Sequence, residues 1–202
     1  MLALAACSLF GGCAEKGPIP IDMRYISPAG MASPARKITV GVSAFKDERT
    51  KPLMVLGKRV YSDGQTDDFI TTGTVAELVA AKLKDALTSR GITVKDVAGW
   101  DMTPEGIKPE GVDVLFGGEI KMLWVESESA VLNTKLVSEV KLRVAVADVK
   151  EKKIFRTLTL TSKLERTDFS FSLETVEDTL SHALSSAIDQ LMNDEELKKK
   201  IP

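Results

Sequence analysis

Cysteine is scarce in this chain of 202 residues, and its two copies, Cys7 and Cys13, both lie within the first thirteen positions. The rest of the chain therefore has no thiol from which a disulfide or a thiolate metal site could form. Histidine is scarcer still, because His182 is the only one. A histidine-based triad or zinc site needs partners at clustered or helical spacing, and His182 has none. We therefore predict no metal site, no cofactor and no catalytic residue, so that the chain is not an enzyme.

A charge of one sign and a long apolar run are also missing. The 27 basic and 29 acidic residues leave a formal net charge of −2, whereas domains that bind nucleic acid are normally clearly basic. No uninterrupted apolar run approaches the roughly 20 residues that a membrane-spanning helix needs. Hydrophobic residues make up 44% of the chain and charged residues 28%, which is typical of a globular domain. The composition therefore argues against nucleic acid as a partner.

The amino-terminal segment, 1–12, is apolar, small and uncharged, as in the hydrophobic part and cleavage region of a secretory signal. The basic leader that precedes such a segment is absent here, and we expect translation to start upstream. The segment also resembles the bacterial lipoprotein box, in which small residues precede an acylated cysteine. Residues 4–7 match that box letter for letter, but an apolar stretch follows Cys7, whereas the chain turns polar directly after Cys13. We therefore predict lipidation, for example by palmitate, at Cys13, with Cys7 as the alternative.

A lipid anchor of this kind has consequences for location. Two or three acyl chains hold a protein on a bilayer essentially permanently. In such lipoproteins an aspartate after the cysteine favours the inner membrane, so Ala14 implies anchoring to the bacterial outer membrane, with the domain facing the periplasm. Four prolines interrupt residues 13–36, which predicts a lipid-anchored tether there. Ile19, Ile21 and Tyr25 leave open an alternative in which this stretch lies along the domain as an edge strand.

From residue 37 the apolar residues recur regularly, which predicts a single α+β periplasmic domain over 37–202. Alternation over 38–44 predicts a strand, and turn signals within 53–70 predict a hairpin-like excursion. A capping box, Thr74-x-x-Glu77, predicts the start of a helix that ends near Arg90. Residues 92–97 then predict a short strand.

Three long strands follow, over 112–124, 136–146 and 158–164, and each alternates apolar and polar residues. In the first of them we place Met122 and Trp124 on the apolar face. A helix over 173–192 closes the domain with one apolar side. A sheet with one apolar face is covered on one side only. We therefore predict a two-layer sandwich, with a mostly antiparallel mixed sheet of about five strands and two helices on one face.

The uncovered face offers candidate partner contacts. It carries Glu139, Lys141 and Arg143, whose mixed charge suits polar, reversible binding better than burial of an acyl chain. Phe169 and Phe171 are a second candidate, because polar residues flank both. An edge strand could pack the two rings inward, or they could form an exposed contact patch.

Several of these features together resemble the YajG family of bacterial lipoproteins. They are the Cys13 start with its proline-rich tether, the Asp47-x-Arg49 turn, the helix end over 83–91, the long strand from Val112, and the hairpin and final helix after it. The same order of elements is similar to a broader group of envelope domains that includes the amino-terminal domain of TolB and the activator LpoB. The resemblance implies partner binding without catalysis.

Two hypotheses for function follow. The first is a non-enzymatic, lipid-anchored scaffold or regulator that binds another envelope protein. The alternative is a carrier or sensor that binds a lipid, a glycan or a muropeptide in a groove. A deep apolar pocket with converging polar groups would favour the carrier, whereas a flat exposed patch or an open sheet edge would favour the scaffold.

Overall fold

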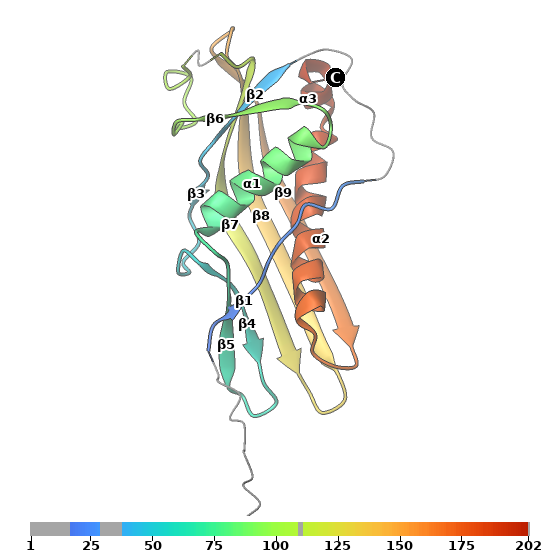
Figure 1. Ribbon diagram of the computed structural model, residues 1–202. Coiled ribbons are helices and arrows are strands. Elements are labelled where there is room, and N and C mark those ends of the chain that lie inside the picture. Colours follow the sequence, from blue (N-terminus) through green and yellow to red (C-terminus); the bar gives the residue numbers. More distant parts are fainter. Residues whose placement is uncertain (1–16, 29–37, 109–110, 202) are drawn as a thin grey trace, which may run out of the picture.

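The computed structural model of this chain describes residues 17–28, 38–108 and 111–201, which form one mixed sheet and three helices (Figure 1). The strands are β1 (Ile19–Pro20), β2 (Thr39–Ser43), β3 (Lys46–Asp47), β4 (Val55–Val60), β5 (Thr66–Ile70), β6 (Thr93–Val97), β7 (Val114–Ser129), β8 (Thr134–Asp148) and β9 (Lys153–Asp168). The helices are α1 (Val75–Thr88), α2 (Leu173–Met192) and α3 (Glu195–Lys200).

Strand β7 organises the sheet. On one side it pairs antiparallel with β8 along almost its whole length, and β8 pairs antiparallel with β9. On its other side β2, β3 and β4 follow one another along β7, all parallel to it. Outside these short strands, β6 pairs with β2, β5 with β4, and β1 with β5. The long pairs are antiparallel, as the alternating sequence predicts.

The sheet has nine strands in the described residues, more than the predicted number of about five. Two of the additional strands, β1 and β3, have two residues each, too few to give an alternating pattern. The other two, β4 and β5, are the arms of the predicted hairpin, which joins the main sheet because β4 pairs with β7. Sequence periodicity indicates strands but does not show which hairpins a long strand will recruit.

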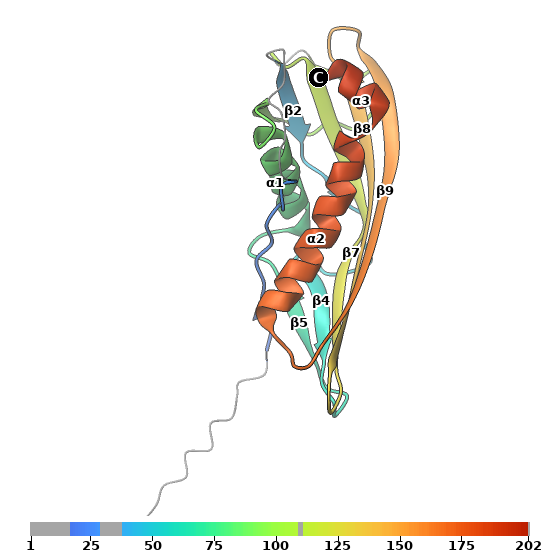
Figure 2. The ribbon, with the colours of Figure 1, turned by 90° about the vertical axis from the view of Figure 1, so that its right-hand side faces the viewer.

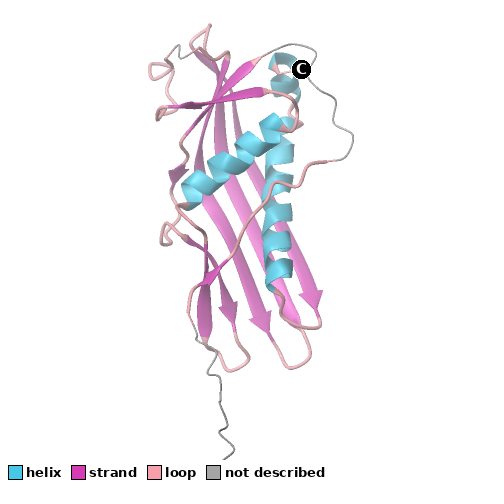
Figure 3. Ribbon diagram, viewed as in Figure 1, coloured by secondary structure: helices cyan, strands magenta, loops and turns pink. Residues whose placement is uncertain are grey.

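Both long helices cover the same face of the sheet, as predicted, and we call it the inner face (Figures 2 and 3). Helix α1 begins at the predicted capping box: Glu77 N donates to Thr74 Oγ1 over 3.2 Å, and Thr74 N donates to Glu77 Oε2 over 2.8 Å. The apolar sides of α1 and α2 form the main core with the inner face of β7, β8 and β9. Burial of these side chains from water is the main force that holds the two layers together.

A β-bulge in β7 changes which side chains face the core. Ile120 lies opposite Leu142 and Met122 lies opposite Lys141, so Lys121 is an extra residue in the ladder. Beyond the bulge Leu123 and Val125 are fully buried, whereas Met122 and Trp124 lie on the opposite face. The prediction that Met122 and Trp124 share the apolar face is therefore wrong, because one inserted residue reverses the alternation.

Part of the predicted tether packs on the helices. Residues 21–26, which we call the N-terminal strap, run from β1 along α2, and Ile21 and Met23 are buried in the main core. Backbone amides of the strap donate to Ser181 Oγ and Ser185 Oγ of α2 over 3.2 and 2.8 Å. Of the residues in the edge-strand alternative, Ile19 does lie in a strand, where it pairs with Phe69 of β5. The rest of the predicted tether, 13–16 and 29–36, lies outside the described residues.

The outer face of the sheet, opposite the helices, is covered at one end. Trp100, Ile107 and neighbouring apolar residues pack there on β7 and β8 as a second, smaller core. Gly117 makes this approach possible, because a Cβ at that position would lie 2.8 Å from the Trp100 ring. The prediction of a sheet covered on one side only therefore holds for the remainder of the outer face and fails at this end.

Candidate functional site on the outer face of the sheet

The uncovered part of the outer face carries the candidate site. Its three strands present alternate residues in register, so that Trp124, Glu139 and Lys163 follow one another across β7, β8 and β9. Met122, Lys141 and Thr161 form the next row. These rows bring together side chains that lie about forty residues apart in the sequence. We call this region the Trp124 surface.

Open hollows follow this surface. The hollow beside Trp124 has a volume of about 440 Å³. Its lining consists of Lys51, Pro52, Val55, Lys58, Asp68, Met122, Trp124, Glu126 and Glu139. Two neighbouring hollows of about 290 and 310 Å³ share Glu139 with it. Their walls mix charged groups with short apolar stretches, which is the character of a contact surface for a polar partner.

Trp124 is held in place from one side by a cation. The Lys51 ammonium lies 4.6 Å from the centre of the Trp124 ring, which is within the range of a cation–π interaction. Lys58 Nζ pairs with Glu126 Oε2 over 3.3 Å beside it. These contacts orient the indole, which is only half-buried, so part of an amphipathic ring stays accessible on a charged surface.

Most charges on the outer face are paired across strands. Arg143 pairs with Glu119 over 3.4 Å, and Lys163 Nζ lies 3.8 Å from Glu139 Oε1. A hydrogen bond with Glu165 and that carboxylate's charge raise the pKa of Lys163. By contrast, Lys141 is exposed and has no ion-pair partner among the described residues. Lys141 is therefore the basic group of this surface that a partner could pair with at the lowest cost.

A second charge cluster lies beside the bulge. Lys121 contacts Glu48 and also pairs with Glu119 over 2.8 Å, while Lys46 pairs with Glu48 over 2.7 Å. Hydrogen bonds from Lys121 and Lys46 lower the pKa of Glu48 to about 2. Lys121, the extra residue of the bulge, is thus held on the outer face by its ion pairs with Glu48 and Glu119.

The structure separates the residues proposed as partner contacts. Glu139, Lys141 and Arg143 lie together on the outer face, as expected. Phe169 is 95% exposed at the end of β9, whereas Phe171 points inward and stacks on Phe69 with ring centres 6.4 Å apart. Their function as contacts stays a prediction.

Sequence reasoning missed Trp124 as a surface residue. Residues 122–125 are all apolar, so the sequence itself does not show which of them face the core. Only the position of the bulge decides, and nothing in the sequence around Lys121 marks it as an inserted residue.

The remaining predictions concern the cysteines, the histidine and the features that the sequence argued against. Both Cys13 and Cys7 lie outside the described residues. His182 is exposed on α2. Within the described part of the chain, no cluster of potential ligands could hold a metal ion. In the same residues, none of the helices has the length and hydropathy needed to span a bilayer.

Comparison with solved structures shows the fold. Protein XCC0632 from Xanthomonas campestris, described as a DUF330 protein, is 13% identical, with a TM-score of 0.53, over 86% of this chain and 91% of its own. At that identity the similarity concerns the fold alone. No family model matches the chain, and no curated protein does. The resemblance to the YajG family therefore stays a prediction.

Weaker structural similarities extend to a protein described as a lipoprotein and to a domain of LpoB. Lipoprotein GNA1162 from Neisseria meningitidis is 11% identical, with a TM-score of 0.42, over 78% of this chain and 99% of its own. The carboxy-terminal domain of LpoB from Salmonella enterica is 10% identical, with a TM-score of 0.32, over 67% of this chain and 86% of its own. Scores this low carry no argument about the function of this chain.

Proposed function

We propose that this chain is a non-enzymatic lipoprotein of the bacterial outer membrane, anchored through Cys13, whose periplasmic domain acts as a scaffold or regulator. In this proposal the Trp124 surface binds another envelope protein. The anchor rests on the small apolar segment that ends at Cys13 and on the polar chain after it. The partner contact rests on one observation, which is the placement of Trp124 on an otherwise charged and uncovered sheet face.

The chemistry of this surface suits a protein partner. Aromatic residues are enriched at interfaces because they bury a large area and lose little conformational entropy. Around Trp124, Lys141 and Glu139 offer charges of both signs, which favour specificity and fast association over tight binding. Hollows of a few hundred Å³ can receive side chains of the partner.

The carrier hypothesis receives less support. A lipid carrier needs an apolar groove, and the space along the inner helices is occupied by the N-terminal strap through Ile21 and Met23. The hollows of the outer face place charged side chains, such as Lys58, Glu126 and Glu139, among their apolar ones, which makes them unsuited to an acyl chain. A glycan stacked on Trp124 is the form of this alternative that the experiment below can still detect.

The anchor is tested by metabolic labelling of the full chain with a palmitate analogue. We expect the label on the protein and its loss in Cys13→Ala, because acylation requires that thiol. Retention of the label in Cys13→Ala, with loss in Cys7→Ala, would show that the other cysteine is the anchor.

The partner surface is tested by photo-crosslinking in cells, with the reactive amino acid at Thr161 beside Lys141. We expect a crosslinked protein of defined mass whose yield falls in Trp124→Ala and in Lys141→Glu. The matched control is Lys198→Glu on α3, an equal charge change at an exposed position. An equal yield in all variants would contradict the proposed surface, and glycan in place of protein at the crosslink would favour the carrier.

A further inference from the structure

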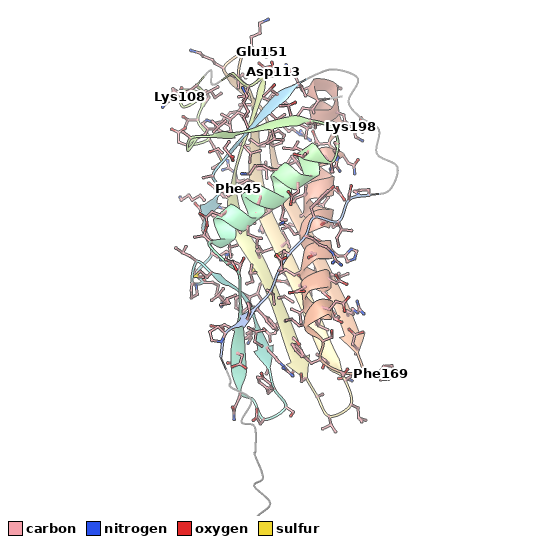
Figure 4. The ribbon with its side chains drawn as sticks, viewed as in Figure 1. Phe45, Lys108, Asp113, Glu151, Phe169 and Lys198 are labelled. Atoms are coloured by element: carbon pink, nitrogen blue, oxygen red, sulfur yellow. The ribbon has the colours of Figure 1, made fainter. Side chains whose placement is uncertain are left out.

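Three chain reversals meet at one end of the long strands. They are the turns at 61–65 and 130–133 and the connection from β9 to α2 at 169–172. Register fixes this arrangement: Val60 in β4 lies opposite Glu128 in β7, and Thr134 in β8 lies opposite both Ser129 in β7 and Asp168 in β9. Figure 4 shows Phe169 projecting at this end, with Glu151 at the other. We call it the hairpin end.

The hairpin end exposes large apolar side chains. Val131, Leu132 and Phe169 are 92%, 80% and 95% exposed, and we call these three residues the apolar tip. Scattered apolar residues on a surface need no explanation, but three at one tip indicate contact with an apolar phase. Turn positions normally carry glycine, asparagine or other polar residues, so Val131 and Leu132 are unusual choices for a free turn.

The opposite end of the same strands provides an internal comparison. There the turn between β8 and β9 contains three exposed charged residues in succession, Lys150, Glu151 and Lys152. The turns at the two ends of β8 thus differ in chemistry, which indicates that they face different surroundings.

The chain enters the fold at the hairpin end. Strand β1 is parallel to β5, and β5 begins at Thr66 beside the turn at 61–65, so Gly17 and Pro18, which directly precede β1, lie on the side of that turn (Figure 1). Only four peptide steps separate Cys13 from Gly17. Four residues span at most about 14 Å even when fully extended. An acylated Cys13 therefore keeps the membrane close to the hairpin end, whatever path those residues take.

We propose that the apolar tip inserts into the lipid surface of the membrane, so that the long strands stand upright on the bilayer. This inference rests on the proposed anchor at Cys13. Side chains such as Phe and Leu settle at the boundary between headgroups and acyl chains, and a neighbouring anchor removes most of the entropic cost of bringing them there. Charges next to the tip are paired, as Arg166 is with Asp168 over 3.0 Å, which limits the cost of approaching the headgroups.

An upright orientation also gives the Trp124 surface a defined direction. That surface lies along the side of the long strands, between the hairpin end and the covered end of the outer face. With the tip in the membrane, it faces sideways along the bilayer. A partner anchored in the same membrane could then reach it without passing under the domain.

The test is a depth measurement on the acylated full chain in vesicles of phosphatidylethanolamine and phosphatidylglycerol. Acylation consumes the Cys13 thiol and signal removal takes away Cys7, so one introduced cysteine is the only free thiol. A fluorescent nitrobenzoxadiazole group is attached in Leu132→Cys, in Phe169→Cys and in the control Lys150→Cys. We expect nitroxide-labelled lipid to quench most of the fluorescence at both tip positions and aqueous iodide to quench it only at the control position.

A second set of variants separates insertion from mere proximity. With the fluorophore at Leu132→Cys, Phe169→Asp should restore access to iodide, whereas Phe169→Leu should not. Tip fluorophores as open to iodide as the control, on protein that still carries its acyl label, would overturn the insertion and leave the anchor intact. Protein without acyl label or membrane association would overturn the anchor and this inference with it.

Discussion

Arg49 keeps a charged group inside the fold, and its partners explain why this is tolerated. The side chains of Arg49 and Asp47 are only 2% and 5% exposed, and they pair over 2.8 Å. Arg49 Nη1 also donates to the carbonyls of Val55 and Leu123, which ties the start of β4 to β7. The Asp47-x-Arg49 turn, one of the features on which the resemblance to a lipoprotein family rests, is therefore a structural clamp on a buried charge.

Removing one partner of this pair should be costly. We expect Asp47→Ala to lower the free energy of unfolding by about 3–5 kcal/mol, because it leaves the Arg49 charge buried without its counterion. Urea denaturation of the purified protein measures the loss. The control is Glu165→Ala at an exposed ion pair with Lys163, for which about 0–1 kcal/mol is expected. Equal losses in both variants would contradict the clamp.

The ionisation of Tyr25 makes the stability of the N-terminal strap depend on pH. Burial and then the hydrogen bond to Asp189 raise the pKa of Tyr25 to about 12, while Arg90 opposes both. A raised tyrosine pKa means that its contribution to stability is complete below the unfolded value of about 10 and is lost as the pH rises through 12. The chain has two tyrosines, so Tyr61→Phe isolates the signal of Tyr25.

We therefore expect the ultraviolet absorbance of Tyr61→Phe to titrate near pH 12 rather than near 10. Asp189→Asn should move that titration to lower pH, because it weakens a hydrogen bond that favours the neutral phenol. Titration of Tyr25 near pH 10 in protein that is still folded would contradict the packing of the strap on α2.

At the scale of elements, the N-terminal strap should be part of the folded unit. We expect Met23→Ala to lower the free energy of unfolding by about 2–5 kcal/mol, because Met23 is 2% exposed in the main core and its truncation leaves a cavity there. The control is Arg24→Ala, whose side chain is 70% exposed and whose loss should cost about 1 kcal/mol or less. Thermal unfolding of both variants gives the comparison. A strap that merely tethers the domain would show no difference.

Long periodic elements could be predicted from the sequence, and short or shifted ones could not. The helix after Thr74 and the helix from Leu173 appear where capping residues and apolar spacing place them. Strand β3 cannot be predicted in this way, because two residues are too few to give a periodic pattern and they form a strand only by pairing with β7. The position of Trp124 depends on the bulge at Lys121, a property of pairing with β8 and not of local composition.

The same distinction applies to the candidate site. Glu139, Lys141 and Arg143 were predictable because strict alternation along β8 assigns them to one face. Trp124 joins them only through the register of two strands, and the apolar tip becomes visible only when three separate turns are seen to meet. The pattern along one strand thus shows which residues share a face. The pairing between strands shows which residues of different strands become neighbours.

For the molecule as a whole, we expect the free energy of unfolding to be lower at acidic pH than at neutral pH. Among the described residues the pKa is lowered for carboxylates throughout the fold: Asp47, Glu48, Glu77, Asp101, Asp148, Glu165 and Asp194. Burial raises the pKa of Asp47 and Asp194, but hydrogen bonds from Arg49 and Arg156 outweigh it. A lowered carboxyl pKa adds stability that is present above the unfolded value and lost as the pH falls through the folded value.

We therefore expect the free energy of unfolding to hold steady from pH 7 to about 5 and to fall below about 4, where unfolded carboxylates bind protons first. Denaturation curves at stepped pH measure this slope. Asp194→Asn should make the slope shallower, because Asp194 binds Arg156 over 2.5 Å and also caps α3. Stability that rose on acidification would contradict the assignment, since it would require carboxylates that are held protonated in the folded state.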